Sequence, residues 1–158
     1  MTDSLKISLA QLNPVVGDIE GNVAKIRAAR LAAADSGADL VIGTELCITG
    51  YPPEDLILKN AFVRAAMAAV EALAAETADG GPGLIVGAPW FDGEDSRYNA
   101  AVVLDDGKVQ TVRCKWDLPN YGVFDEKRIF KAGELPGPVN FRGVRLGLVV
   151  CEDMWTSD

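Results

Sequence analysis

Short apolar runs alternate with longer helical segments over the first half of the chain, and this alternation limits the folds open to it. Residues 5–12 alternate polar and apolar side chains, as a half-buried strand does, and residues 39–45 and 83–90 are apolar through their middles, as buried strands are. Between them lie two segments predicted to be helical, from Asp18 to Ser36 and from Glu54 to Ala78. Strands that alternate with helices predict a layered α/β fold.

The second half of the chain differs, because two predicted strands follow each other without a helix. Residues 99–104 and 108–115 flank Asp105-Asp106-Gly107, which is typical of a hairpin turn because Asp-Gly tolerates positive φ. After an irregular stretch at 118–137, residues 144–150 form the last predicted strand. The predicted order is β-α-β-α-β-β-β-loop-β in one domain, with a mixed sheet.

The chain contains no histidine, and this excludes the commonest catalytic groups. A Ser–His–Asp or Cys–His group and any histidine-bearing metal site are impossible. Cys47, Cys114 and Cys151 lie far apart without a Cys-x-x-Cys pair, so we predict neither a metal site nor a disulfide framework. Any nucleophilic chemistry must therefore use a base other than imidazole.

The net charge of −8 argues against a nucleic-acid partner, since such binding depends on Lys and Arg that neutralise phosphates. Residues 1–10 lack the pattern of a signal peptide, and no apolar run is long enough to span a membrane. We therefore expect a reduced, cytoplasmic protein with no membrane partner.

Three reactive residues each stand at the end of a predicted strand. Glu45 ends the strand at 39–45, Lys115 ends the hairpin, and Cys151 follows residue 150. Because sites in open α/β sheets form at the carboxyl ends of the strands, we expect the three side chains to meet.

These three residue types suit the hydrolysis of an amide. The thiolate of Cys151 is the nucleophile, and Glu45 takes the thiol proton and returns it to the leaving ammonia. Lys115 stabilises the thiolate and the oxyanion, with the backbone N–H of Glu152 as a second donor. The carboxylates of Glu152 and Asp153 add negative charge beside the thiol, so a nearby lysine is needed.

Each of the three residues also has a structural interpretation. Cys151 can be a small buried hydrophobe, as we interpret Cys47 and Cys114. Glu45 can begin a solvated turn, and Lys115 can lie at the surface, as most lysines do. The residue types alone leave both interpretations open.

Around these residues the sequence resembles the nitrilase superfamily of carbon–nitrogen hydrolases, and within it the glutaminase domains of glutamine-dependent NAD synthetases. Three blocks carry the resemblance in order: TELCITGYPPEDL at 44–56, KWDLPNYGVFDEKRIF at 115–130 and GLVVCEDMW at 147–155. The similarity covers the whole chain, from ISLAQLNPVVGDIEGN at 7–22 onward. Thr44 stands where the family more often has proline before its glutamate.

The resemblance implies an αββα sandwich of which residues 1–158 are only the N-terminal part, because the chain ends soon after the nucleophile. It implies a Glu45–Lys115–Cys151 triad, with Glu126 as a second glutamate that supports Lys115. The alternative for Glu126 is a solvated charged segment. Without the rest of the sandwich, we expect exposed apolar surface along 144–150 and little activity from this chain alone.

The resemblance also implies a glutamine pocket lined by Tyr51, Tyr121 and Phe124, with the backbone N–H of Glu152. Packing is the alternative for Tyr51 and Phe124, and an ordinary loop position is the alternative for Tyr121.

The implied reaction is the hydrolysis of glutamine to glutamate and ammonia through a glutamyl thioester, without a cofactor. The ammonia would pass through a tunnel to a synthetase domain, absent from this chain, which amidates deamido-NAD with ATP and Mg²⁺. Such enzymes assemble as homo-oligomers. Two alternatives are a stand-alone nitrilase-type amidase acting on another small amide and an inactive structural fragment.

Overall fold

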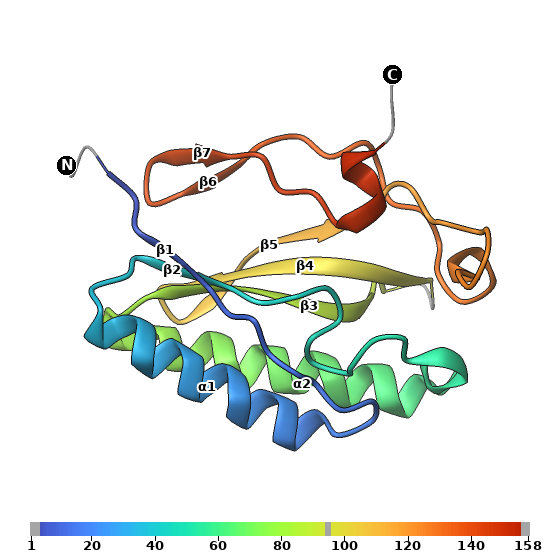
Figure 1. Ribbon diagram of the computed structural model, residues 1–158, viewed down its shortest axis with the longest axis horizontal. Coiled ribbons are helices and arrows are strands. Elements are labelled where there is room, and N and C mark those ends of the chain that lie inside the picture. Colours follow the sequence, from blue (N-terminus) through green and yellow to red (C-terminus); the bar gives the residue numbers. More distant parts are fainter. Residues whose placement is uncertain (1–3, 94–95, 156–158) are drawn as a thin grey trace.

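The computed structural model describes residues 4–93 and 96–155 and arranges them in three layers (Figure 1). Two long helices, α1 (Ile19–Asp35) and α2 (Asn60–Glu76), lie along one face of a sheet, and the C-terminal part of the chain lies over the other face. The strands of the sheet are, in chain order and in spatial order, β1 (Ile7–Leu9), β2 (Leu40–Ile42), β3 (Gly83–Phe91), β4 (Arg97–Asp105) and β5 (Lys108–Cys114). The predicted α/β class is confirmed.

Smaller elements complete the described chain. Strands β6 (Val139–Phe141) and β7 (Val144–Leu146) form a separate antiparallel pair. The short 3₁₀ helices are η1 (Glu54–Leu58), η2 (Thr77–Asp79), η3 (Glu126–Arg128) and η4 (Cys151–Met154).

Helix α1 begins and ends where its sequence provides caps. Asp18 precedes the helix, and its carboxylate accepts a hydrogen bond from the backbone N–H of Gly21 at 2.9 Å. Gly37 follows the helix with a φ of 73°, a left-handed conformation that glycine adopts without strain. The predicted helix is confirmed.

The second predicted helical stretch is divided by one residue. Lys59 has extended backbone, with φ −88° and ψ 106°, and separates η1 from α2. The alanine-rich part of the stretch forms α2, which buries Val63, Ala66 and Val70 against the sheet.

The direction of the strands brings three strand ends together. Strands β1, β2 and β3 run parallel, whereas β4 and β5 each run antiparallel to the preceding strand. Asp106 and Gly107, with φ of 51° and 76°, form the predicted turn between β4 and β5. The sheet is therefore mixed, as predicted, and the carboxyl ends of β2, β3 and β5 lie at the same end of it.

Both faces of the sheet are apolar. On β3 and β4, alternate residues pack against the helices, including Val86 and Val102, and the residues between them face the C-terminal layer. That layer covers Ile85 and Val103 with Phe141 and Val150, among others.

The prediction of a strand over 144–150 is wrong beyond Leu146. Residues 147–150 have no strand pairing, and they cross the open face of the sheet with Val150 packed into it. The apolar pattern reflects this packing, which periodicity does not distinguish from strand pairing. Val144 and Val149 are 39% and 41% exposed, in agreement with the apolar surface expected along this segment.

Three further sequence predictions need adjustment. Strands β1 and β2 are shorter than the segments predicted at 5–12 and 39–45, and β6 falls in a region without a predicted strand.

None of the helices in the described ranges is long and apolar enough to cross a membrane.

Candidate active site

Lys115 directly follows β5, and its side chain is fully buried. Its ammonium group donates hydrogen bonds to Glu45 Oε1 at 2.8 Å and to Glu126 Oε1 at 2.9 Å. Burial alone would lower the pKa of Lys115, but the hydrogen bonds and charges of the two glutamates outweigh burial and raise it. Lys115 is therefore held as a cation between two carboxylates, and its interpretation as a surface lysine is wrong.

Glu45 lies in a tight turn after β2, three residues beyond the end of that strand. The turn contacts Gly87 of β3 so closely that a Cβ atom at Gly87 would lie 2.2 Å from Leu46 N and 2.6 Å from Thr44 O. Only glycine permits this approach of two backbones. Gly87, which the sequence analysis did not identify, therefore sets the position of Glu45.

Glu126 lies in η3 and is buried, so it does not belong to a solvated charged segment. Its Oε1 accepts hydrogen bonds from Lys115 and, at 3.4 Å, from the hydroxyl of Tyr51. Burial raises the pKa of the Glu126 carboxyl, and Lys115 acts in the opposite direction. Burial, followed by the charges of Glu45 and Glu126, raises the pKa of Tyr51 as well, so the phenol stays protonated and can donate.

Asn99 is a fourth polar group in this cluster, and the sequence analysis missed it. It is fully buried on β4, its side-chain Nδ2 donates to Glu45 Oε1 at 2.7 Å, and its backbone oxygen accepts from Lys115 N–H at 2.7 Å. An amide at the start of the apolar run in β4 is the sequence signal that points to it.

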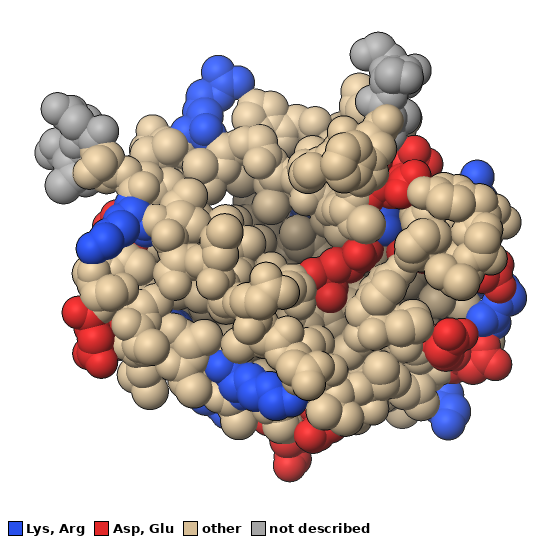
Figure 2. Space-filling view, viewed as in Figure 1, with Lys and Arg blue, Asp and Glu red and all other residues tan. Residues whose placement is uncertain are grey.

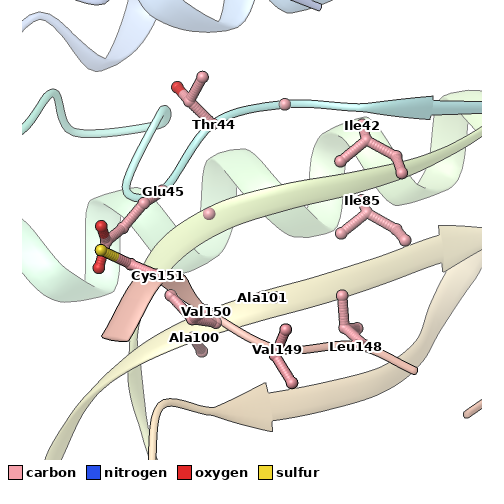
Figure 3. A pocket seen from close by; sticks show the side chains of 12 residues that line it. Ile42, Thr44, Glu45, Ile85, Ala100, Ala101, Leu148, Val149, Val150 and Cys151 are labelled. Carbon is pink, nitrogen blue, oxygen red and sulfur yellow. The ribbon is translucent and has the colours of Figure 1, made fainter. Parts of the chain in front are cut away.

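Cys151 is the first residue of η4, and its side chain points toward the carboxylate of Glu45 (Figure 3). It is exposed, and its φ of 46° places a non-glycine residue in the left-handed region. Such backbone strain persists only where the surrounding structure imposes it. Because its side chain is exposed, the interpretation of Cys151 as a buried hydrophobe is wrong. Cys47 is buried, as predicted, whereas Cys114, for which the same was predicted, is only half-buried.

A cavity of about 110 Å³ opens beside Cys151, between the end of the sheet and the C-terminal segment. Twelve residues line the cavity: Ile42, Gly43, Thr44, Glu45, Ile85, Gly87, Ala100, Ala101, Leu148, Val149, Val150 and Cys151. In the space-filling view of Figure 2, the surface is hollowed near the middle of the molecule, and acidic side chains lie beside the hollow. The candidate site is thus mostly apolar, with its polar groups gathered at one end.

The pKa of the Cys151 thiol is raised, first by partial burial and then by the negative charge of Glu45. Lys115 opposes this shift, and a hydrogen bond with Glu45 adds to it. The thiol is therefore protonated at rest, next to a carboxylate that can accept its proton. The charges that raise this pKa are those of Glu45 and Glu126, while the carboxylates of Glu152 and Asp153 accept hydrogen bonds from Tyr121 and from backbone N–H groups.

Asp153 holds the turn that carries Cys151. One oxygen, Oδ1, accepts hydrogen bonds from the backbone N–H groups of Trp116 and Asp117 at 3.0 and 2.8 Å, and Oδ2 accepts from Val150 N–H at 2.9 Å. This one carboxylate links the residues that follow Lys115 to the residue that precedes Cys151. The sequence analysis treated Asp153 only as a charge and missed this role.

The predicted pocket residues Tyr51, Tyr121, Phe124 and Glu152 are not among the residues that line the cavity beside Cys151. Tyr121 is 59% exposed, its hydroxyl donates to both carboxylate oxygens of Glu152 at 3.0 and 3.1 Å, and its ring contacts Phe124 edge-on with centroids 5.6 Å apart. Tyr121 thus donates a hydrogen bond to Glu152, whereas Tyr51 donates one to Glu126. Among residues 4–93 and 96–155, no group of three His, Cys, Asp or Glu side chains is arranged to hold a metal ion.

Comparison with known proteins gives consistent results. A sequence profile described as carbon–nitrogen hydrolase matches residues 6–158. A glutamine-dependent NAD(+) synthetase of Rhodobacter capsulatus is 49% identical over 158 residues, which is all of this chain but 28% of that protein. The chain thus spans little more than a quarter of the length of this curated relative.

Solved structures show the same fold. The glutamine-dependent NAD+ synthetase of Acinetobacter baumannii superposes with a TM-score of 0.85 at 36% identity, over 96% of this chain and 28% of that one. An amidase of Nesterenkonia sp. AN1 superposes with a TM-score of 0.78 at 29% identity, over 94% of this chain and 57% of that one. That structure, of a glutamate variant, shows the Michael addition of acrylamide at the active-site cysteine of the amidase.

Proposed function

We propose, because the chain belongs to the family of carbon–nitrogen hydrolases, that its site hydrolyses the side-chain amide of glutamine and releases ammonia. The observation that carries this proposal is the arrangement of three side chains. The Lys115 side chain is buried, and its Nζ lies 2.8 Å from Glu45 Oε1. The thiol of Cys151 faces the same carboxylate from the opening of the cavity. The three side chains thus meet around one point, which supports the proposed roles of base, cation and nucleophile.

The first half of the proposed reaction forms a thioester. Glu45 takes the proton of Cys151, and the thiolate attacks the amide carbon of glutamine. The oxyanion of the tetrahedral intermediate is stabilised by Lys115 and by the backbone N–H of Glu152. The carbon–nitrogen bond then breaks as Glu45 returns its proton to the leaving nitrogen, which departs as ammonia.

The second half restores the enzyme. Glu45, again ionised, takes a proton from a water molecule that attacks the thioester carbon. The carbon–sulfur bond breaks, the thiol of Cys151 is re-formed with that proton, and glutamate leaves. Atoms and charges balance without a cofactor, so the proposed glutaminase step needs none.

Glu126 supports this chemistry through Lys115. The ammonium has three N–H donors, and the structure describes hydrogen bonds from two of them, to Glu45 and Glu126. These bonds hold Lys115 in one orientation, so that its remaining donor is directed to the oxyanion without reorganisation. Tyr51, Tyr121 and Phe124 form the proposed pocket for the rest of the glutamine molecule.

We further propose that the chain is the N-terminal glutaminase part of a longer NAD synthetase. The support is the match to only 28% of the length of the R. capsulatus relative. Its ammonia would serve a synthetase domain that amidates deamido-NAD with ATP and Mg²⁺, in a cytoplasmic homo-oligomer. Within this proposal the isolated chain has little activity of its own.

The test is ammonia release from glutamine by the full-length protein and by its Cys151→Ser and Glu45→Gln variants. Loss of release in both variants, together with trapping of a glutamyl adduct on Cys151 in the parent, supports the proposal. Unchanged release from Cys151→Ser contradicts it.

A second candidate is a stand-alone amidase acting on another small amide. The likeness to the Nesterenkonia amidase favours it, because that structure superposes with a TM-score of 0.78 over 94% of this chain and 57% of the amidase. Comparing ammonia release from glutamine with release from acetamide and propionamide distinguishes the two. A preference for the simple amides supports the amidase.

A further inference from the structure

We infer that Asn99 is the positioning residue that holds one carboxylate oxygen of Glu45 on Lys115 and leaves the other oxygen to the thiol of Cys151. The inference rests on the proposed function, in which Glu45 takes the thiol proton. It concerns a side chain that none of the three catalytic roles requires.

The hydrogen bonds of Glu45 are unevenly divided between its two oxygens. Asn99 Nδ2 donates to Oε1 at 2.7 Å, and Lys115 Nζ donates to the same oxygen at 2.8 Å. Among the described residues, no nitrogen donor is hydrogen-bonded to Oε2. Two donors on one oxygen fix the rotation of the carboxylate, and the oxygen that they leave is the one able to accept a proton from Cys151.

Asn99 is itself held in place by the sheet, so it can fix the positions of the side chains that it contacts. It lies in β4, paired with Pro89 of β3, and its exposed fraction is 0%. Its backbone oxygen accepts the N–H of Lys115 at 2.7 Å, so one residue holds the base by its side chain and the lysine by its backbone. The separation of Glu45 and Lys115 is therefore determined by a single position in the sheet.

The choice of an amide follows from the charges around it. Four titratable side chains face Glu45: Lys115 after β5, Glu126 in η3, Tyr51 in the turn before η1, and Cys151 in η4. The cluster already holds two carboxylates and one ammonium group. A neutral donor stabilises the ionised form of Glu45 without disturbing that balance.

The amide also leaves one group unpaired. Within the described part of the chain, Asn99 Oδ1 is buried without a hydrogen-bond partner. A buried carbonyl oxygen without a partner is unfavourable, so this oxygen does not account for the presence of asparagine. The residue is retained, we infer, for its donor.

The test uses the full-length protein with Asn99→Leu, which removes the donor at similar volume, and Asn99→Asp, which nearly preserves the shape. The pH dependence of kcat/KM for glutamine hydrolysis is measured for each. We expect kcat/KM to fall about 10- to 100-fold, the factor for one hydrogen bond to a charged group. The acid limb of the profile should move to higher pH in Asn99→Leu, because the carboxylate has lost a hydrogen-bond donor.

In Asn99→Asp the acid limb should move further in the same direction, since a negative charge then replaces a donor beside Glu45. The matched control is Asn22→Leu, which removes a buried asparagine of α1 that bonds to the backbone of Val15 and Ile48. That control should lower thermal stability and leave the acid limb in place. An unmoved limb in both Asn99 variants overturns the inference, whatever the loss of activity.

A second readout separates this inference from the proposed function. The rate of inactivation by chloroacetamide at Cys151 is measured against pH without glutamine. If the parent does not hydrolyse glutamine, the proposed function fails, and the inactivation profile still tests Asn99. A limb that moves up in the Asn99 variants supports the inference, and a limb at the parent's position overturns it. Should Asn99→Leu fail to fold, Asn99→Asp alone decides.

Discussion

Two parts of the candidate site are built in different ways. The carboxylate–lysine cluster, which we define as Glu45, Asn99, Lys115 and Glu126, sits at the end of the five-stranded sheet, and its lysine and asparagine are fully buried. The thiol turn, which we define as residues 150–153, has no strand pairing, and its cysteine is exposed.

The carboxylate–lysine cluster and the thiol turn are held in place by different interactions. The cluster is held by strand pairing, by a close contact at Gly87 and by ion pairs inside the protein. The thiol turn depends on the packing of Val150 and on the hydrogen bonds of one side chain, Asp153. We therefore expect changes in the cluster to affect stability and activity together, and changes in the thiol turn to affect mainly activity.

The largest effect should come from Lys115→Met, which leaves Glu45 and Glu126 as unpaired carboxylates inside the protein. Breaking a buried ion pair in this way destabilises a protein by about 3–5 kcal/mol. Thermal unfolding should show this loss, and glutamine hydrolysis should disappear. Lys108→Met, at an exposed position of β5, is the control and should change neither. A stable and active Lys115→Met variant would refute the cluster as described.

A large loss of activity, with a smaller loss of stability than in Lys115→Met, should follow from Asp153→Ala. The variant loses three hydrogen bonds to backbone N–H groups, and Cys151 is no longer fixed against the residues after Lys115. We expect kcat/KM to fall about 100-fold, since misplacing a reacting group by about 1 Å has that effect. Steady-state kinetics and a thermal melt of the same sample provide the check.

The matched variant for that prediction is Asp153→Asn, which keeps one acceptor oxygen and should lose less. If Asp153→Ala lowers the melting temperature as much as Lys115→Met does, the two parts do not differ as we claim.

A moderate effect on both properties should follow from Gly87→Ala. The added Cβ would meet the backbone of Leu46 and Thr44, so the turn that carries Glu45 must move. Overpacking of this kind costs about 1–3 kcal/mol. Gly147→Ala is the control, because a Cβ there meets nothing within 4 Å and the residue lacks positive φ. Equal melting temperatures for the two variants would show that the contact at Gly87 is not needed.

The smallest expected effect is a difference in alkylation between Cys151 and the two other cysteines, Cys47 and Cys114, and its measurement needs no mutation. Burial raises the pKa of both Cys47 and Cys114 to about 11, so both thiols stay protonated until the solution is strongly alkaline. The pKa of Cys151 is raised as well, but this thiol is exposed and lies beside the carboxylate of Glu45, so iodoacetamide at neutral pH should modify Cys151 alone. Raising the pH toward 11 should add Cys114, which is half-buried, before Cys47. Peptide mapping after each treatment measures the order, and early modification of Cys47 would contradict it.

The sequence predicted the layers of the fold and the order of its elements well. The helix after Asp18 and the turn at Asp106 and Gly107 are confirmed, because caps and turn residues act locally. The nitrilase-like fold is confirmed by the superpositions, which cover the N-terminal part of both matched structures. The last strand was predicted wrongly, because residues 147–150 are apolar for packing rather than for pairing.

In the site, the sequence identified the charged residues but not the residues that place them. Glu45, Lys115 and Glu126 stood out by type and by the resemblance of their surroundings, and the structure brings them together. Gly87 and Asn99 act through contacts between strands that are distant in the chain. Such contacts leave little local pattern, so only the folded structure reveals them.

The most direct test of the account is reaction with a diazoketone analogue of glutamine, followed by mass spectrometry of the peptides. The account predicts a single adduct on Cys151 in the full-length protein, slowed by glutamine and absent from the Glu45→Gln variant. Adducts spread equally over Cys47, Cys114 and Cys151, or an adduct that glutamine does not slow, would contradict the claim that Cys151 and Glu45 form a glutamine-hydrolysing site.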